Sequence, residues 1–305
     1  MSIPLSYVSV IIIWSTTPLG IQWSGEQVGY EFGVAARMLI GLALLTLIVR
    51  LRRMPMPFTR DAWQVYLLGG IPLFIAMTSV YWSAQYIPSG WISVIFGLSP
   101  IMTSVLAVFL LKESAFADGK LYGMLLGLGG LSLVFRESLL LGDSAWLGVL
   151  AVLVSVSAHS PSAVLLKRKG TSIPAISVTT GALLIATPLF WLNLMLGPGL
   201  PSTLPERAMW AIVYLGVMGS AIGFPLYYYL LSKLSAGRLA LITLITPVTA
   251  LLLGNRLNGE VISADVWGGT ALILCGLAIY EFGHRFRSLR RISRRLALRW
   301  RQRPM

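Results

Sequence analysis

Few side chains in this sequence could bind a solute or move a proton, and those few lie within long apolar stretches. The guanidinium of Arg37 can bind a carboxylate through two parallel hydrogen bonds. The imidazole of His159 exchanges protons close to neutral pH when its surroundings do not perturb it. Trp14, Tyr81 and Tyr228 are large aromatic residues that could form the wall of an apolar binding site. These residue types favour substrate binding and proton transfer over covalent chemistry.

Arg37 and His159 each have a structural interpretation that stays open. Arg37 is expected near one end of its helix, where a long side chain can extend to the membrane surface or pair with Glu26 or Glu31. His159 is expected near the middle of its helix, where a single hydrogen bond to a neighbouring helix would suffice. The functional alternatives are capture of a substrate carboxylate by Arg37 and proton switching by His159.

The aromatic residues divide into two groups by their expected depth in the membrane. Those at predicted helix ends fit an interfacial aromatic belt: Trp23, Tyr86 and Trp91. Trp14 is different, because it is expected at mid-depth beside the polar, proline-containing stretch 15–18, which is unsuited to face lipid. We therefore predict that Trp14 forms a cavity wall, with Tyr81 and Tyr228 as its companions.

The sequence offers no arrangement that is typical of a membrane enzyme. It contains no HExxH pair, no P-loop, no GxSxG nucleophile motif and no pair of aspartates inside an apolar stretch. We therefore expect no catalytic residue, no cofactor and no metal ion. All eleven Asp and Glu fall in predicted loops or at helix ends. Glu113 and Glu260, which each follow a predicted helix, are expected to stabilise the N-terminus of the next helix.

The composition places all of these residues in a bilayer. Of the 305 residues, 56% are hydrophobic and 11% are charged, and the mean hydropathy of +0.78 excludes a water-soluble globular protein. A bilayer core about 30 Å thick requires roughly 20 apolar residues per helix. Ten such stretches predict an all-α integral membrane protein with ten transmembrane helices, at residues 4–23, 32–49, 64–82, 91–111, 120–136, 146–166, 173–194, 208–231, 238–256 and 266–283.

The basic residues predict how the chain is oriented in the membrane. The formal charge is +13, and most Lys and Arg fall in loops on the same side as both termini, so the positive-inside rule places both termini in the cytoplasm. This distribution favours a multi-pass protein of the inner (plasma) membrane, with the anionic inner leaflet as its lipid partner, over a nucleic-acid-binding protein. The basic tail 284–305 could be an amphipathic helix on that leaflet or a disordered cytoplasmic anchor.

The sequence contains an internal repeat. Residues 98–118 read LSPIMTSVLAVFLLKESAFAD and residues 245–265 read ITPVTALLLGNRLNGEVISAD, and an offset of 147 makes 15 of the 67 pairs aligned over residues 63–129 identical. Each half, 1–139 and 140–283, carries five predicted helices, an odd number, so the halves are predicted to be inverted repeats. Such repeats enclose a site near the membrane midplane and expose it alternately to each side.

Four prolines are predicted to bend helices around this site. A proline inside a helix removes a backbone donor and leaves the carbonyl group four residues earlier without its usual partner. These prolines could line the cavity or act as hinges, or they could be packing kinks alone: Pro18, Pro100, Pro161 and Pro247.

These features together resemble the drug/metabolite transporter superfamily, EamA type. The resemblance covers nearly the whole chain and includes the stretches IIIWSTTPLG, AARMLIG and LSPIMTSVLAVFLLKE. It implies an inner-membrane carrier, often an exporter of amino acids or related metabolites, whose cavity is lined by spans one, three, four, six, eight and nine. The second half departs from this pattern, because VSVSAHSPSAVLL in the sixth span has no tryptophan equivalent to Trp14.

We therefore predict a secondary transporter that moves small organic metabolites by alternating access, and the resemblance favours export of amino acids or related amphipathic compounds. The alternative is an uncoupled facilitator or channel for small amphipathic solutes, because proton-coupled carriers commonly use a carboxylate inside the membrane, and here every Asp and Glu falls in a predicted loop or at a helix end. Gly119, Gly123 and Gly127, spaced four residues apart, predict close helix packing either within one protomer or in a homodimer.

Overall fold

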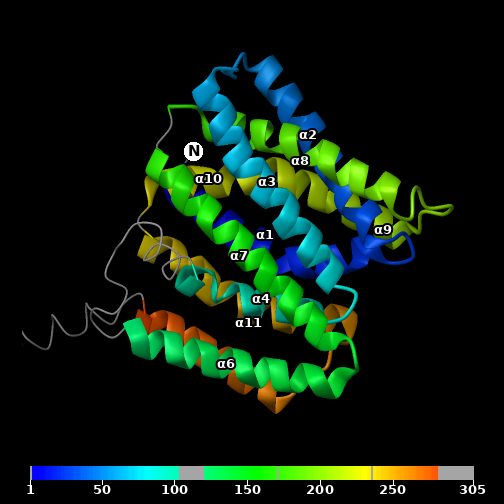
Figure 1. Ribbon diagram of the computed structural model, residues 1–305, viewed down its shortest axis with the longest axis vertical. Coiled ribbons are helices and arrows are strands. Elements are labelled where there is room, and N and C mark those ends of the chain that lie inside the picture. Colours follow the sequence, from blue (N-terminus) through cyan, green and yellow to red (C-terminus); the bar gives the residue numbers. More distant parts are fainter. Residues whose placement is uncertain (1, 103–119, 170–171, 235, 281–305) are drawn as a thin grey trace, which may run out of the picture.

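The computed structural model describes residues 2–102, 120–169, 172–234 and 236–280, and this part of the chain consists of helices and the turns between them, without a strand (Figure 1). The first half contains α1 (Ile3–Gly25), α2 (Tyr30–Leu51), α3 (Arg60–Ser83), α4 (Ser89–Phe96) and α6 (Lys120–Leu141). The second half contains α7 (Ala145–Lys169), α8 (Ala175–Leu196), α9 (Glu206–Tyr214), the π-helix η1 (Leu215–Gly223), α10 (Phe224–Lys233), α11 (Ala236–Asn258) and a final helical segment, Ala264–Tyr280.

Seven helices in the described part of the chain are long and apolar enough to cross a membrane, with α9, η1 and α10 counted as one helix. Ser89–Met102 and Ala264–Tyr280 are shorter apolar helices, and α11 is a helix of 23 residues. The architecture is therefore that of an all-helical integral membrane protein. The predicted fourth span, 91–111, extends beyond the described residues, so the total of ten spans stays a prediction.

Helix starts follow local sequence signals. Thr59 caps α3, because its hydroxyl accepts a hydrogen bond from the backbone N–H of Ala62 at 3.4 Å. Pro88, Pro174 and Pro205 immediately precede α4, α8 and α9. A proline costs no hydrogen bond at such a position, since the first N–H groups of a helix have no helical partner. These helix starts are therefore encoded locally.

The helix that runs from α9 to α10 widens in its middle. Leu215–Gly223 is π-helical, and Pro225 follows at the start of α10. Proline has no N–H to donate to the preceding turn, so the regular α-helical pattern cannot continue through it unchanged. A π-helical turn is rare in proteins and is frequently found at a functional site. This turn places Gly219 and Ser220 against α2.

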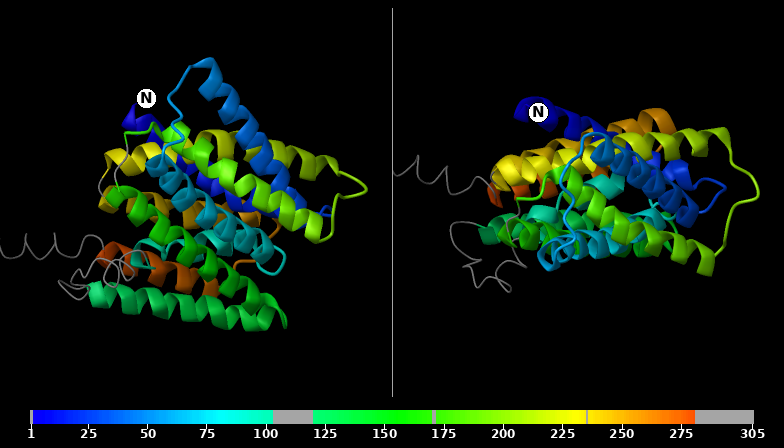
Figure 2. Two further views of the ribbon diagram at one scale, coloured as in Figure 1. Left: turned by 45° about the horizontal axis from the view of Figure 1, so that its top comes forward. Right: turned by 90° about the horizontal axis from the view of Figure 1, so that it is seen from above.

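The two halves of the chain interdigitate. α3 packs against α7 and α8, α2 packs against α8 and η1, and both α1 and α4 pack against α11, so each of these contacts joins one half to the other (Figures 1 and 2). Small residues permit the close approaches. For example, a Cβ added to Gly70 of α3 would lie 2.6 Å from the carbonyl oxygen of Ala182 in α8. The central helices therefore form one body built from both halves.

α6 and the segment Ala264–Tyr280 lie side by side along one edge of the bundle in both figures (Figures 1 and 2). Their backbones nearly touch at glycines. A Cβ added to Gly123 would lie 2.5 Å from the carbonyl oxygen of Gly276, and one added to Gly130 would lie 2.5 Å from that of Gly269. Gly123, one of the predicted packing glycines, thus packs within one protomer, and the homodimer stays a prediction.

Three sequence predictions fall on residues outside the described part of the chain. They concern the packing glycine Gly119, the carboxylate of Glu113 and the basic tail 284–305. The structure therefore tests none of the three.

Candidate functional site

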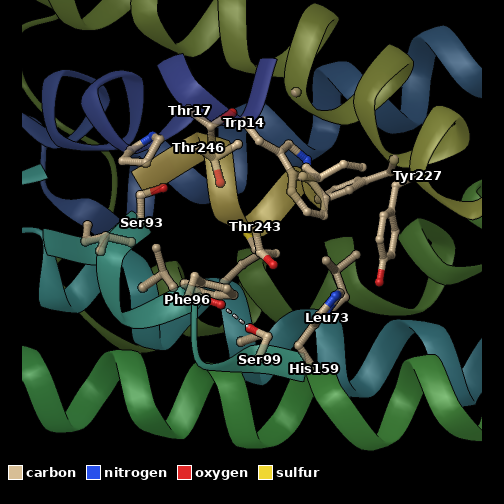
Figure 3. Close-up of a pocket in the computed structure, with 18 of the residues that line it drawn as sticks. Trp14, Thr17, Leu73, Ser93, Phe96, Ser99, His159, Tyr227, Thr243 and Thr246 are labelled. Carbon is tan, nitrogen blue, oxygen red and sulfur yellow. Dashed lines mark hydrogen bonds between the residues drawn. The ribbon is translucent and has the colours of Figure 1, made fainter. Parts of the chain in front are cut away.

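The helices enclose a cavity of about 300 Å³ (Figure 3). Its wall is formed by both halves of the chain: α1, α2, α3 and the α4 region from the first, and α7, η1, α10 and α11 from the second. These elements correspond to predicted spans one, three, four, six, eight and nine, with α2 as an addition. The volume is at the lower end of the range for small-molecule sites. A metabolite of modest size could therefore fit.

An aromatic cluster forms one wall of the cavity. The ring centroid of Tyr227 lies 4.9 Å from that of Trp14, 5.8 Å from that of His159 and 5.8 Å from that of Tyr228. All four residues line the cavity, and Figure 3 shows Trp14, Tyr227 and His159 around it. The structure thus brings together three residues that the sequence had singled out, Trp14, His159 and Tyr228.

The centre of this cluster, Tyr227, was not predicted. Three consecutive tyrosines, 227–229, occur at this point, and the sequence does not reveal how the helix is rotated. The repeat drew attention to Tyr228 because it aligns with Tyr81. His159 forms no hydrogen bond with any described residue, so the expected link to a neighbouring helix is replaced by a ring contact with Tyr227.

Arg37 is buried and lines the cavity, with only 2% of its surface exposed. Its Nε donates a hydrogen bond to Ser220 Oγ at 3.0 Å, and its Nη1 donates one to the hydroxyl of Tyr81 at 3.3 Å. Both structural interpretations are therefore wrong. The side chain does not reach the surface, and Glu26 pairs with Arg207 instead, at 3.5 Å. No described carboxylate forms an ion pair with Arg37.

Two aromatic predictions differ from the structure. Tyr81 is 1% exposed and is not among the described residues that line the cavity, so it holds Arg37 rather than forming a wall beside Trp14. Trp91 was predicted for the interfacial belt, but it is 2% exposed and belongs to the apolar core. Both differences have the same cause. The neighbours of a helix face decide whether an aromatic side chain is exposed, and neither residue type nor depth reveals them.

Of the four predicted prolines, two line the cavity, Pro18 and Pro100, and two do not belong to its described lining, Pro161 and Pro247. The helix breaks just before Pro100: α4 ends at Phe96, residues 97–98 form a turn, and helical structure resumes at Ser99. Pro100 cannot donate to the carbonyl oxygen of Phe96. The hydroxyl of Ser99 donates to it instead, at 2.7 Å (Figure 3). The irregular backbone is thus satisfied at the cavity wall.

At one end of the bundle, Glu260 holds the N-terminus of α4. Its carboxylate accepts hydrogen bonds from Ser89 N at 3.0 Å, from Ser89 Oγ at 2.6 Å and from Gly90 N at 3.2 Å. A carboxylate at this position stabilises the partial positive charge of the helix start. The predicted kind of contact is confirmed, but the predicted partner is wrong. The helix is α4, distant in sequence, and not the one that follows Glu260.

Asn258 extends this contact to α1 and α9. Its Nδ2 donates to Glu260 Oε1 and to Gln22 Oε1, both at 3.2 Å, and its Oδ1 accepts from Trp23 Nε1 and from Arg207 Nη2, both at 3.0 Å. One amide therefore uses both of its donors and both of its acceptor sites. The result is a polar network that joins α1, α4, α9 and α11 at this end. No sequence signal singled out Asn258.

Comparison with known proteins decides the family. The model of the EamA-like transporter family matches the chain twice, at residues 2–136 and 146–281. The chain belongs to the EamA-like transporter family. The resemblance to the drug/metabolite transporter superfamily is thereby confirmed.

Several curated proteins are similar to this chain over most of its length. An uncharacterised transporter of Bacillus subtilis, YoaV, is 24% identical over 285 residues, which cover 92% of this chain and 97% of that protein. Protein PagO of Salmonella typhimurium is 24% identical over 271 residues, covering 86% and 87%. A probable terminal-alkyne amino-acid exporter of Streptantibioticus cattleyicolor is 24% identical over 286 residues, covering 88% and 92%.

A solved crystal structure has the same fold. It superimposes with a TM-score of 0.68 at 23% identity and covers 93% of this chain and 99% of its own. The protein is thus a multi-pass membrane protein of a transporter family. Its family and the names of its relatives indicate transport and not catalysis.

Proposed function

We propose that this EamA-like protein is a secondary carrier that exports small amphipathic metabolites, amino acids or close relatives of them, by alternating access to the central cavity. The observation that carries the proposal is the cavity itself, which lies between the two halves and is lined by residues of both. Substrates of alternating-access carriers bind in this position, at the interface between repeats.

The chemistry of the cavity wall supports an amphipathic solute. Trp14, Tyr227 and Tyr228 offer a large apolar surface, and Arg37, Ser93 and Thr246 supply a few polar groups among apolar neighbours. Apolar pockets with few polar groups bind through shape and through a small number of orienting hydrogen bonds. Such a site suits an apolar side chain attached to a polar head.

The family matches support the proposal of two inverted halves, 1–139 and 140–283, followed by the tail 284–305. The same family model fits both segments, and each segment corresponds to one predicted set of five spans. An odd number of spans per half inverts the second half relative to the first. The polar network around Asn258 and Glu260 fits a carrier that is closed at this end, because it ties three elements that line the cavity, α1, α4 and α11, to one another and to α9.

The direction and location proposed are supported by relatives and by charge. The Streptantibioticus relative is named as a probable amino-acid exporter, and a relative in Escherichia coli, YedA, is named as an inner membrane transporter. The distribution of Lys and Arg favours an inner-membrane protein with cytoplasmic termini.

A facilitator or channel is the second candidate. It is favoured by one observation: no Asp or Glu belongs to the described lining of the cavity, so the group that commonly couples transport to protons is missing there. Such a protein would need no conformational cycle around a single bound solute.

Counterflow in proteoliposomes tests the proposal. Vesicles preloaded with unlabelled leucine and phenylalanine should take up the labelled amino acids faster than empty vesicles do. The reason is that a carrier with bound substrate changes from its inward-facing to its outward-facing conformation faster than an empty carrier does. Trp14→Ala should abolish this uptake, since it removes the aromatic wall, whereas Trp210→Ala, a change at a residue 59% exposed, should not. Uptake that is indifferent to preloading would favour the channel, and unchanged uptake by the folded Trp14→Ala variant would remove Trp14 from the site.

A further inference from the structure

The positive charge of Arg37 has no counter-charge in the described part of the chain. The guanidinium is nearly inaccessible at 2% exposure, and the side chains that it contacts by hydrogen bonds, Ser220 and Tyr81, are neutral. Removing a cation from water is costly unless an anion or a full set of hydrogen bonds compensates it. A buried cation at a cavity therefore calls for an anion inside that cavity.

The two hydrogen bonds fix the guanidinium but leave donors free. Arginine carries five N–H groups in a rigid plane. The bond from Nε to Ser220 and the bond from Nη1 to Tyr81 use one donor each. The phenyl ring of Phe224 lies 5.8 Å from the guanidinium carbon and limits its movement further. The group is therefore oriented in advance, with donors of Nη1 and Nη2 available for a ligand.

A missing side chain gives Nη2 its access to the cavity. Gly219 of the π-helix lies directly against Nη2, because a Cβ added there would lie only 2.8 Å from that atom. Both Gly219 and Arg37 belong to the cavity lining. Any larger residue at position 219 would stand between the guanidinium and a bound solute.

We infer that Arg37 binds a carboxylate of the transported solute, so that the substrate class is a small acid or amino acid with one anionic group and an apolar remainder. The inference rests on the proposed transport function and specifies what the carrier selects. A planar carboxylate matches the fork of Nη1 and Nη2. The apolar remainder then lies toward the aromatic cluster of Trp14 and Tyr227, which lines the same cavity.

The charge of the cavity sets the number of anionic groups. Arg37 is the only Lys or Arg in the described lining. A phosphate dianion or a dicarboxylate would therefore leave at least one negative charge buried without a partner, which is as costly as the unpaired cation. A single carboxylate balances the charge of the guanidinium. An amino acid would bring its ammonium as well, and the hydroxyl and carbonyl groups on the wall can accept hydrogen bonds from it.

A panel of matched acids and amides tests this inference. The probes are acetate, butyrate, 4-methylpentanoate, 3-phenylpropionate, leucine and phenylalanine, each compared with its amide, and binding is read as the thermal shift of the full-length protein in detergent. We expect at least one acid to stabilise the wild type while its amide, which has nearly the same shape but lacks the negative charge of the carboxylate, binds at least about tenfold more weakly.

Three variants locate the effect. Arg37→Met should lose the discrimination between acid and amide, and Arg37→Lys should weaken acid binding because a point charge replaces the fork. Gly219→Ala keeps the charge and should still weaken acid binding, which separates loss of the site from loss of folding. Arg136→Met is the matched control, since that arginine is exposed and pairs with Asp265.

Amides that bind the wild type as tightly as the acids, or a wild type that binds none of the acids, would overturn the inference. Transport of neutral solutes under the same conditions would show that the protein is a carrier even though Arg37 binds no carboxylate of the solute. Acid binding in the absence of any counterflow would instead contradict the proposed function and leave the carboxylate site in place.

Discussion

At the scale of single residues, the cavity combines an apolar wall with one permanent cation and one group that can change its charge. Arg37 is held by Ser220 and Tyr81, so its position is fixed before any solute arrives. Among the described residues, His159 is held by packing alone, against Tyr227. A fixed cation suits recognition, because orientation is set in advance. A loosely held imidazole suits a change of protonation, because no hydrogen bond has to break.

The first prediction concerns His159. If this imidazole changes protonation during transport, flux should depend on pH on the acidic side of neutrality, between about 5 and 7, in the wild type. The ionisable groups that share its surroundings in the described lining of the cavity are the phenols of Tyr227 and Tyr228 and the guanidinium of Arg37. His159→Gln should therefore flatten the profile to less than about a twofold change over that range.

Proteoliposomes buffered symmetrically at each pH give the measurement for His159, because no proton gradient then contributes to the flux. A lower overall flux in His159→Gln would not contradict the prediction, which concerns only how the flux changes with pH. A variant that keeps the profile of the wild type would show that His159 is a packing residue.

At the scale of secondary structure, the sequence predicts where the helices lie along the chain, but not which helices pack against one another. The predicted spans 4–23 and 208–231 end within two residues of the helices Ile3–Gly25 and Glu206–Lys233, because the length of an apolar run sets both boundaries. The π-helical turn inside the second of these was not predicted, since only the packing around Pro225 and its neighbours decides it.

Contacts between distant segments were equally hidden from the sequence. Residue type and expected depth in the membrane sufficed to single out Trp14, Arg37 and His159 as candidates, and all three line the cavity. Tyr227 and Asn258 could not be found in that way, because their roles depend on the rotation of one helix and on the meeting of four others. The roles of these two residues are therefore set by packing between distant segments and not by a local sequence pattern.

The second prediction concerns the cap on α4. Glu260→Gln keeps the shape of the side chain but removes its charge and turns one acceptor into a donor, facing N–H groups of Ser89 and Gly90. Stability should fall by about 1 kcal/mol, as for the loss of other helix caps. The melting temperature in detergent should therefore decrease, whereas Glu206→Gln, at an exposed position in the first turn of α9, should lower it less.

Accessibility then shows whether this cap keeps one end closed. In a Cys275→Ser background, a cysteine introduced at Ser93 lies on the cavity wall one helical turn from the cap. Glu260→Gln should increase the rate at which an impermeant maleimide labels it. An unaltered labelling rate together with reduced stability would show a cap that stabilises α4 without controlling access.

At the scale of the whole molecule, the proposed mechanism depends on two related halves that face opposite sides of the membrane. The cavity wall draws on both, and the tight helix pairs cross from one half to the other. Residues related by the repeat should then occupy equivalent places in opposite leaflets. The sequence already shows the adaptation this requires: Tyr86 and Trp91 of the first half correspond to Lys233 and Arg238 of the second, so aromatic residues on one side replace basic residues on the other.

The third prediction is therefore topological. Alkaline phosphatase fused after Tyr86 should be active, and green fluorescent protein fused after Lys233 should fluoresce, because the first reporter requires the outer side and the second requires the cytoplasm. Fusions after Gly199 and Arg53, in loops predicted for the outer and inner sides, calibrate the two signals. Both reporters on one common side would mean that the halves are parallel. A parallel pair cannot open a shared cavity first to one compartment and then to the other by exchanging the conformations of its halves.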